Sequence, residues 1–194
     1  MKDTRNIILL AGLRLFLQKG YKEVTLQDIL EASGQAKGTF YYYFKNKWAL
    51  FEECAKYIIV NFMTVNFGKL PNSSVKDFID GLLAAESRAY KRMASLGENF
   101  KIQILVGQAS VRIPEIALLV KEQEKKQLSA WEKILEAGRT SGEIRISIDN
   151  AELASLFITI QEGISAKQLK SVANINTIEQ LTVSWHNLYE IIRK

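Results

Sequence analysis

Ser33-Gly-Gln-Ala-Lys-Gly-Thr-Phe-Tyr-Tyr-Tyr-Phe-Lys-Asn-Lys-Trp48 is the stretch that decides the fold of this chain. It predicts a tight turn, a short helix, a second turn and the start of a longer helix. Gly34 stands where a preceding helix must stop, because glycine accepts the left-handed backbone with which many helices end. Asn46 is a candidate N-cap for the longer helix, and Lys47 then lies at its positive end.

The short helix separates into two faces at 100° per residue. The face predicted to be core holds Ala36, Phe40, Tyr43 and Phe44. The opposite face is small, basic and aromatic, and it holds Lys37, Gly38, Tyr41 and Tyr42, with Thr39 on the flank. Lysine neutralises phosphate or contacts guanine, and tyrosine hydroxyls donate to phosphate oxygens. This face therefore predicts contact with DNA, although a generic run of tyrosines is more often half-buried packing.

Residues 6–54 resemble the DNA-binding domain of the tetracycline-repressor (TetR) family of bacterial transcription regulators. The matching segments are Leu15-Phe16, Gly20-Tyr21, Val24-Thr25-Leu26-Gln27-Asp28-Ile29, Ala32-Ser33-Gly34, Lys37-Gly38-Thr39-Phe40-Tyr41, Tyr43-Phe44, Lys45-Asn46-Lys47 and Leu50-Phe51. Two positions depart from the family pattern, because Gln35 replaces a small apolar residue and Ala36 replaces a common capping serine. These departures affect the turn and the start of the recognition helix, not the fold.

The resemblance implies an all-α fold of about nine helices in two domains. Residues 1–46 would form a three-helix, helix–turn–helix DNA-binding domain, and residues 47–194 a helical ligand-binding and dimerisation domain. The predicted DNA contacts are Thr25, Gln27, Lys37, Gly38, Thr39, Tyr41, Tyr42 and Lys47. Thr25 is also the predicted N-cap of the second helix, with Asp28 three residues on. Lys2 and Arg5 either contact DNA or are simply solvated.

The charge distribution agrees with a DNA-binding N-terminal segment. The 194 residues carry a formal net charge of +5. Residues 1–50 hold eight Lys/Arg and four Asp/Glu, which leaves a net +4 in that segment alone. The basic excess therefore lies where the chain is expected to meet DNA. No apolar run is long enough to span a membrane, so we expect no membrane partner and a cytoplasmic, nucleoid-associated protein.

The residues needed for catalysis or metal binding are scarce. Cys54 is the single cysteine and His186 the single histidine, so the sequence has almost none of the residues that a histidine-based triad or a zinc site requires. We therefore expect no enzyme activity, no metal and no cofactor. Cys54 is either a redox sensor or, more simply, a small core residue.

Downstream of the recognition helix, the pattern predicts long helices. One is expected over residues 47–67, and others over 74–96, 98–111, 114–137, 149–170 and from Thr177 onward, which Thr177 and Gln180 would open. Ile144–Ile148 alternates like a strand but has no partner strand in the sequence, so it is expected to be an extended connector. Asp149 and Glu152 are spaced like a capping box at the start of the 149–170 helix.

Glu86 interrupts the apolar stripe of the 74–96 helix, which is costly unless the carboxylate finds a partner. It could anchor a cationic or hydrogen-bonding ligand, pair with an internal Arg or Lys, or reach the solvent edge. The predicted ligand-pocket residues, which core packing would explain equally well, are Phe78, Glu86, Tyr90, Met93, Phe100, Gln103, Trp131 and Gln161. The mixture predicts a bulky, mostly apolar inducer with one polar or charged group.

The last two helices carry strongly apolar stripes that need covering. In the TetR family the corresponding helices form a four-helix interface between two copies, so the resemblance implies a homodimer. The interface residues would be Leu153, Phe157, Ile160, Ile164, Leu181, Trp185 and Leu188. The alternative is that these stripes pack only within one chain.

Together these features predict a ligand-responsive transcriptional regulator. Most simply, it is a repressor that binds a near-palindromic operator in double-stranded DNA as a homodimer and is released by a small-molecule inducer. One alternative is a helical regulator that acts through protein partners, and another is an enzyme with an all-helical pocket. The first alternative is disfavoured because predicted DNA-contacting residues are present, namely Lys37, Thr39, Tyr41 and Lys47. The second is disfavoured because the sequence offers no convincing set of acid, base and nucleophile residues.

Overall fold

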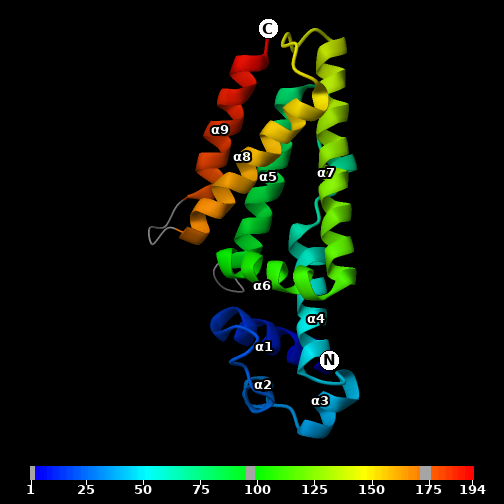
Figure 1. Cartoon of the computed structure of the whole chain (residues 1–194), viewed down its shortest axis with the longest axis vertical. Coiled ribbons are helices and arrows are strands. Elements are labelled where there is room, and N and C mark those ends of the chain that lie inside the picture. Colours follow the sequence, from blue (N-terminus) through cyan, green and yellow to red (C-terminus); the bar gives the residue numbers. More distant parts are fainter. Residues whose placement is uncertain (1–2, 95–98, 171–175) are drawn as a thin grey trace. The chain divides into compact units, whose positions relative to one another are not determined.

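The computed structural model describes residues 3–94, 99–170 and 176–194, without the side chains of residues 99, 100 and 168–170. These residues form nine α-helices, and the all-α prediction is confirmed (Figure 1). The helices are α1 (Thr4–Lys19), α2 (Leu26–Ser33), α3 (Lys37–Tyr43), α4 (Lys47–Ile58), α5 (Val75–Ala94), α6 (Asn99–Arg112), α7 (Pro114–Thr140), α8 (Asn150–Lys170) and α9 (Thr177–Ile192).

The helices pack into two compact units. Unit 1 comprises Met1–Thr64 and Tyr90–Lys121, and unit 2 comprises Val65–Ala89 and Glu122–Lys194. By packing, α4 and α6 therefore belong with α1, α2 and α3, and the helices α5 and α7 contribute to both units. The functional division at residues 46/47 follows the sequence motif and stays a prediction.

The core of unit 1 forms where α1 packs against α2, α4 and α6. Gly12 of α1 allows a close approach, since a Cβ atom there would lie 2.6 Å from Leu50 Cδ2 of α4. The rings of Phe16 and Phe51 meet edge to face at 5.4 Å, and Cys54 is fully buried beside them in the same core. Burial raises the pKa of the Cys54 thiol, so Cys54 is a core residue and not an accessible redox sensor.

Three helix boundaries near the N-terminus follow the predicted local chemistry. Thr25 closes a capping box with Asp28, because its side chain accepts from the Asp28 amide at 3.1 Å and the Asp28 carboxylate accepts from the Thr25 amide at 2.7 Å. Gly34 ends α2 with φ 64° and ψ 24°, in the left-handed region. Asn46 caps α4 by accepting from the Ala49 amide at 2.9 Å. All three predictions are confirmed.

The long helix predicted over residues 47–67 is wrong in its second half. Regular α-helix ends at Ile58, a π-turn continues over Ile59–Met63, and a 3-10 turn covers Phe67–Lys69. Polar side chains compete for backbone carbonyls here: Asn61 donates to the Tyr57 carbonyl at 2.8 Å and Thr64 donates to the Ile59 carbonyl at 2.9 Å. Such local bonds offer the chain an alternative to the α-helical ladder.

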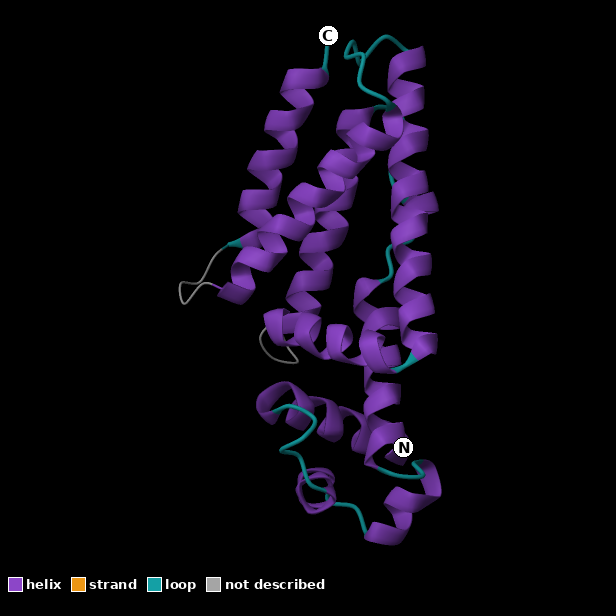
Figure 2. Ribbon diagram, in the orientation of Figure 1, coloured by secondary structure: helices purple, strands orange, loops and turns teal. Residues whose placement is uncertain are grey.

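Unit 2 is built around an aromatic stack, by which we mean Phe78, Trp131, Phe157 and Trp185. Trp131 of α7 stacks on Phe157 of α8 with ring centroids 4.3 Å apart and an interplanar angle of 12°. Phe78 and Trp185 meet Trp131 edge to face at 5.0 and 5.3 Å. The Trp185 indole donates to the Phe157 carbonyl at 2.9 Å, which ties α9 to α8 where the two helices run side by side (Figure 2).

The connector between α7 and α8 is extended, as predicted. Arg139 holds it by donating to the carbonyls of Ile146 and Ile148, and Ile144 forms an isolated antiparallel bridge with Arg193. The preceding Glu143 carboxylate accepts from the first amide of α5, that of Val75, at 2.9 Å. The connector therefore closes the end of unit 2, although it forms no sheet.

The start of α9 departs from the prediction. Asn176, not Thr177, is the N-cap, and its side chain accepts from the Glu179 amide at 3.2 Å. Thr177 is already inside the helix and is buried. At the start of α8, Asp149 acts as a cap by accepting from the Ala151 amide at 2.8 Å, whereas the predicted box bonds between Asp149 and Glu152 are not seen.

A membrane span requires a helix of sufficient length and hydropathy. In the part of the chain that the structure describes, no single helix is long and apolar enough to cross a bilayer. The bent pair Lys101–Arg112 and Pro114–Thr140 meets the length and composition test only when both helices are taken together.

Candidate functional site

The helices α2 and α3, joined by the turn at Gly34, form a helix–turn–helix. Below the turn, Phe40 is fully buried and fixes α3 against the core of unit 1. The backbone amide of Gln35 donates to the Leu30 carbonyl at 3.2 Å, and its side chain donates to the Ser33 carbonyl at 3.3 Å. Gln35 thus stabilises the turn in place of the small apolar residue that the family pattern usually has.

The outward face of α3 is basic and aromatic, as predicted. Tyr42 is 81% exposed and Tyr41 49% exposed, and Lys37 is exposed beside them. A side chain at Gly38 would meet nothing within 4 Å, so the helix surface is open there. The helix backbone is therefore accessible at Gly38, next to the ammonium group of Lys37 and the phenol groups of Tyr41 and Tyr42. Such a surface suits contact with the edge of a DNA groove.

The predicted inner face of α3 is only half right. Phe40 and Phe44 are buried, but Ala36 and Tyr43 are exposed. Ala36 is the N-cap that precedes α3, and the ring of Tyr43 packs edge to face on that of the exposed Tyr42 at 4.9 Å instead of entering the core. Ala36 makes no side-chain cap, in contrast to the capping serine that is common in the family.

The predicted contacts on α2 are held by neighbours on their own helix. Thr25 and Gln27 are both exposed, and Gln27 donates to Glu31 at 2.8 Å. The Thr25 hydroxyl donates to Asp28 at 2.7 Å while accepting from the Asp28 amide. Both side chains would have to share or exchange these bonds to reach a phosphate, so their DNA contacts stay predictions.

Two N-terminal cations are engaged within unit 1. Lys47, which is half-buried, donates to the Tyr21 carbonyl at 2.9 Å and to the Val24 carbonyl. Arg5 pairs with Glu53, and its guanidinium lies 5.3 Å from the centre of the Phe44 ring. Arg5 is therefore not simply solvated, and Lys2 lies outside the described residues.

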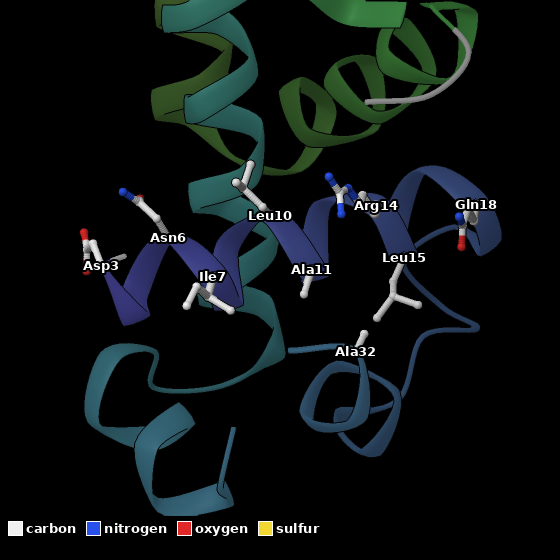
Figure 3. A pocket seen from close by; sticks show the side chains of 9 residues that line it. All are labelled: Asp3, Asn6, Ile7, Leu10, Ala11, Arg14, Leu15, Gln18 and Ala32. Atoms are coloured by element: carbon white, nitrogen blue, oxygen red, sulfur yellow. The ribbon is translucent and has the colours of Figure 1, made fainter. Parts of the chain in front are cut away.

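An open hollow of about 610 Å³ runs along α1 in unit 1. Its lining comes from α1 and the α1 N-cap Asp3, with Ala32 of α2 closing one side (Figure 3). Arg14 and Gln18 give it polar groups, whereas Ile7 and Leu15 make it partly apolar. None of the predicted inducer-pocket residues lines this hollow.

Comparison with known proteins assigns the chain to a family. A family model described as "Bacterial regulatory proteins, tetR family" matches residues 8–54. Transcriptional regulator AcuR of Cereibacter sphaeroides is 30% identical over 166 residues, which cover 79% of this chain and 70% of AcuR. The chain belongs to the TetR family. The HTH-type transcriptional repressor KstR2 of Mycolicibacterium smegmatis is 25% identical over 175 residues, which cover 86% of this TetR-family chain and 79% of KstR2.

Solved structures share the TetR-family fold over the whole chain. PfmR of Thermus thermophilus superposes with a TM-score of 0.71 at 19% identity, covering 94% of this chain and 96% of PfmR. A regulator from Saccharomonospora viridis, solved in complex with choline, has a TM-score of 0.71 at 17% identity and covers both chains completely. This chain is accordingly a TetR-family transcriptional regulator with a helix–turn–helix for DNA binding.

The predicted ligand-pocket residues of this TetR-family chain are divided between the two units. Tyr90, Met93 and Gln103 lie in unit 1, and the side chain of Phe100 lies outside the described part.

In unit 2 the other four predicted pocket residues form two contacting pairs: Phe78 packs on Trp131, and Gln161 donates to Glu86 at 3.0 Å. Neighbouring Gln127 donates to Gln161 at 2.8 Å. Sequence reasoning missed Gln127, although it lies four residues before Trp131 on the same helix face.

Most of the predicted dimer residues are buried within one chain. Leu153, Phe157 and Trp185 have no exposed surface, and Leu181 and Ile164 have 3% and 7%. A side chain that is already covered has nothing left to bury against a second copy, so the argument that these residues need a partner is wrong. Among the described side chains of α8 and α9, the exposed large apolar ones are Leu156, Val183 and Ile191, and Ile160 and Leu188 are partly exposed.

Proposed function

We propose that this TetR-family regulator is a repressor that binds a near-palindromic operator as a homodimer and leaves it when a small molecule binds. The operator lies in chromosomal DNA, so the protein would act in the cytoplasm. The relatives named as repressors, KstR2 and the DhaR repressor of a Mycobacterium species, support repression over activation.

The exposed face of α3 is the observation that carries the proposal. Lys37 and the hydroxyls of Tyr41 and Tyr42 are the groups that would contact phosphates or base edges, and Gly38 would let the DNA approach the helix backbone. Inserted into the major groove, one α3 reads one half-site. Two copies related by a twofold axis would read half-sites about 34 Å apart, which is one turn of DNA.

The dimer would form through the exposed parts of α8 and α9. Val183 is 55% exposed and Ile191 73% exposed on α9, and Leu156 is 44% exposed on α8, so large apolar side chains of both helices are open to a partner. An interface between copies that used the same surface twice would have the twofold symmetry that a palindromic operator requires.

Release by a ligand requires only a modest preference. A ligand that binds the non-DNA-binding arrangement about 100-fold more tightly supplies about 2.7 kcal/mol, enough for a 100-fold loss of DNA affinity. The choline complex of the Saccharomonospora viridis regulator supports a small-molecule effector for this fold. In this chain we propose that the ligand binds among the unit 2 residues around Glu86 and Gln161.

The test is binding of the purified protein to the DNA upstream of its own gene, measured by fluorescence anisotropy against random duplex. We expect preference for the upstream DNA, and a loss of affinity of about fivefold in Tyr42→Phe, since one hydroxyl bond to phosphate contributes about 1 kcal/mol. Tyr57→Phe is the matched control, because Tyr57 lies on α4 and packs on Phe62 instead of facing outward. Equal binding to random and upstream DNA would favour a regulator that acts through protein partners.

A further inference from the structure

A layer of partly buried polar side chains lies next to the aromatic stack in unit 2. This polar layer consists of Glu86 of α5, Gln127 of α7 and Gln161 of α8. Gln127 donates to Gln161 at 2.8 Å, and Gln161 donates to Glu86 at 3.0 Å. Gln127 lies one helical turn from Trp131 and Gln161 one turn from Phe157, so the polar layer and the stacked rings are neighbouring layers of the same interior.

The polar layer has too many acceptors for its donors. The side-chain amide of Gln127 donates to Gln161, and that of Gln161 donates to Glu86. Among the described residues, the Glu86 carboxylate accepts only from Gln161. A carboxylate has room for about four such bonds. One turn beyond Gln127, the side-chain oxygen of Gln123 is buried and accepts from no described group. Glu86 on α5 and Gln123 on α7 are thus each short of a donor among the described residues.

The charge of Glu86 is also uncompensated within the described part of the chain. No Lys, Arg or His there forms an ion pair or hydrogen bond with it, so the predicted internal Arg or Lys partner is not found. Burial raises the pKa of Glu86, and the bond from Gln161 opposes that rise only in part. Glu86 is partly buried, and removing a carboxylate from water with only a neutral partner is costly, so a cation bound to it would offset that cost.

We propose that Glu86 and Gln123 receive the ammonium group of a hydrophobic amine, which is the effector class of this regulator. An ammonium with N–H donors supplies both missing features, positive charge and hydrogen bonds, to a carboxylate and an amide oxygen. Gln127 and Gln161 lie one helical turn from the rings of Trp131 and Phe157, so the surroundings of the ammonium group would be apolar. The inference rests on the proposed function, in which a small molecule binds unit 2.

The test compares three probes that share a phenyl ring and a short chain: phenethylamine, 2-phenylethanol and phenylacetate. Each is titrated by calorimetry into the full-length protein at neutral pH, without DNA. We expect phenethylamine to bind at least about tenfold more tightly than the alcohol, and phenylacetate to bind more weakly than either, because a charged hydrogen bond adds at least 1.4 kcal/mol and a second anion is repelled.

Two variants locate the binding charge. Glu86→Gln keeps the size of the side chain and its bond to Gln161 but removes the charge, so it should erase the preference for the amine and leave binding of the alcohol unchanged. Glu162→Gln removes a neighbouring charge on the exposed side of α8 and should change nothing. A thermal melt by circular dichroism confirms that each variant is folded.

Three results would overturn the proposal: equal binding of amine and alcohol, an unchanged amine preference in Glu86→Gln, or no amine binding at millimolar concentration by the folded protein. Failure of the proposed function has a different signature. If the amine binds but DNA affinity is unaffected, release by this ligand fails while the assignment of the site stands. If the protein binds upstream DNA specifically but binds no amine, its proposed function as a DNA-binding regulator is retained and the proposed ligand class is wrong.

Discussion

The ammonium of Lys47 lies 2.9 Å from the carbonyl oxygen of Tyr21 and 4.4 Å from the centre of the Tyr21 ring. It also donates to the Val24 carbonyl. The first residue of α4 therefore fastens the loop that leads into α2. Two of its three N–H donors are used, which leaves one for a phosphate.

Lys47→Ala should consequently affect both stability and DNA binding. Loss of two bonds from a charged donor should lower the free energy of unfolding by about 1–3 kcal/mol, because two backbone carbonyls lose their partner. If the remaining donor contacts a phosphate, the slope of log affinity against log salt should also fall by about 0.9. Chemical denaturation and anisotropy at several salt concentrations measure the two effects separately.

Lys45→Ala is the matched control for stability, since Lys45 is exposed and forms no side-chain bond with a described residue of unit 1. It should leave the unfolding free energy within about 0.5 kcal/mol of the parent. An unchanged salt slope in Lys47→Ala would remove Lys47 from the DNA contacts and leave it a purely structural role.

Asp28 should make unit 1 sensitive to acid. Hydrogen bonds from the Thr25 hydroxyl and amide, and then from Lys19, hold the pKa of Asp28 at about 2, below its ordinary 3.8. A lowered folded-state pKa contributes stability that is complete above the ordinary value and is lost as the pH falls toward about 2. We expect the difference in unfolding free energy between the parent and Asp28→Asn to shrink over this range in urea titrations.

The control for this pH dependence is Glu124→Gln, an exposed carboxylate on α7. The free energy of unfolding of Glu124→Gln should follow that of the parent at every pH. A parent–Asp28→Asn difference that stayed constant down to the lowest pH would show that folding does not lower the pKa of Asp28.

Two helix glycines should respond to alanine in opposite directions. A Cβ at Gly81 of α5 would overlap the ring of Pro71, which cannot move aside as a flexible side chain can. Gly81→Ala should destabilise the protein by about 1–3 kcal/mol. A Cβ at Gly107 of α6 meets open space, so Gly107→Ala should stabilise by up to about 1 kcal/mol through helix propensity. Thermal denaturation of both variants measures the signs, and a gain of stability in Gly81→Ala would contradict the close packing of Pro71.

Val183 tests the proposed dimer surface. Introducing charge there, as Val183→Glu, should shift the protein from dimer to monomer in light scattering, because a charge at an apolar interface loses its hydration without gaining a partner. Val111→Glu provides the control, since Val111 is 88% exposed but belongs to α6 in unit 1. Dimers that persist in Val183→Glu, or dissociation in Val111→Glu, would move the interface away from α9.

Local sequence chemistry determined the all-α class, the helix–turn–helix and its capping. Thr25 with Asp28, Gly34 and Asn46 act within three or four residues of themselves, so their roles can be inferred from spacing alone. The outward position of Tyr41 and Tyr42 follows for the same reason, because the helical repeat sets which residues oppose the buried Phe40.

Only the tertiary structure decided where long or versatile side chains find their partners. Lys47 reaches a loop more than twenty residues away, and the apolar stripes with Phe157 and Trp185 are covered by α7 of the same chain, not left for another copy. Likewise, the sequence shows that Glu86 interrupts an apolar stripe. It does not show that Gln161, 75 residues further along the chain, donates a hydrogen bond to it. Periodicity reports the face on which a residue lies, whereas its partner depends on how distant helices pack, and no local pattern encodes that.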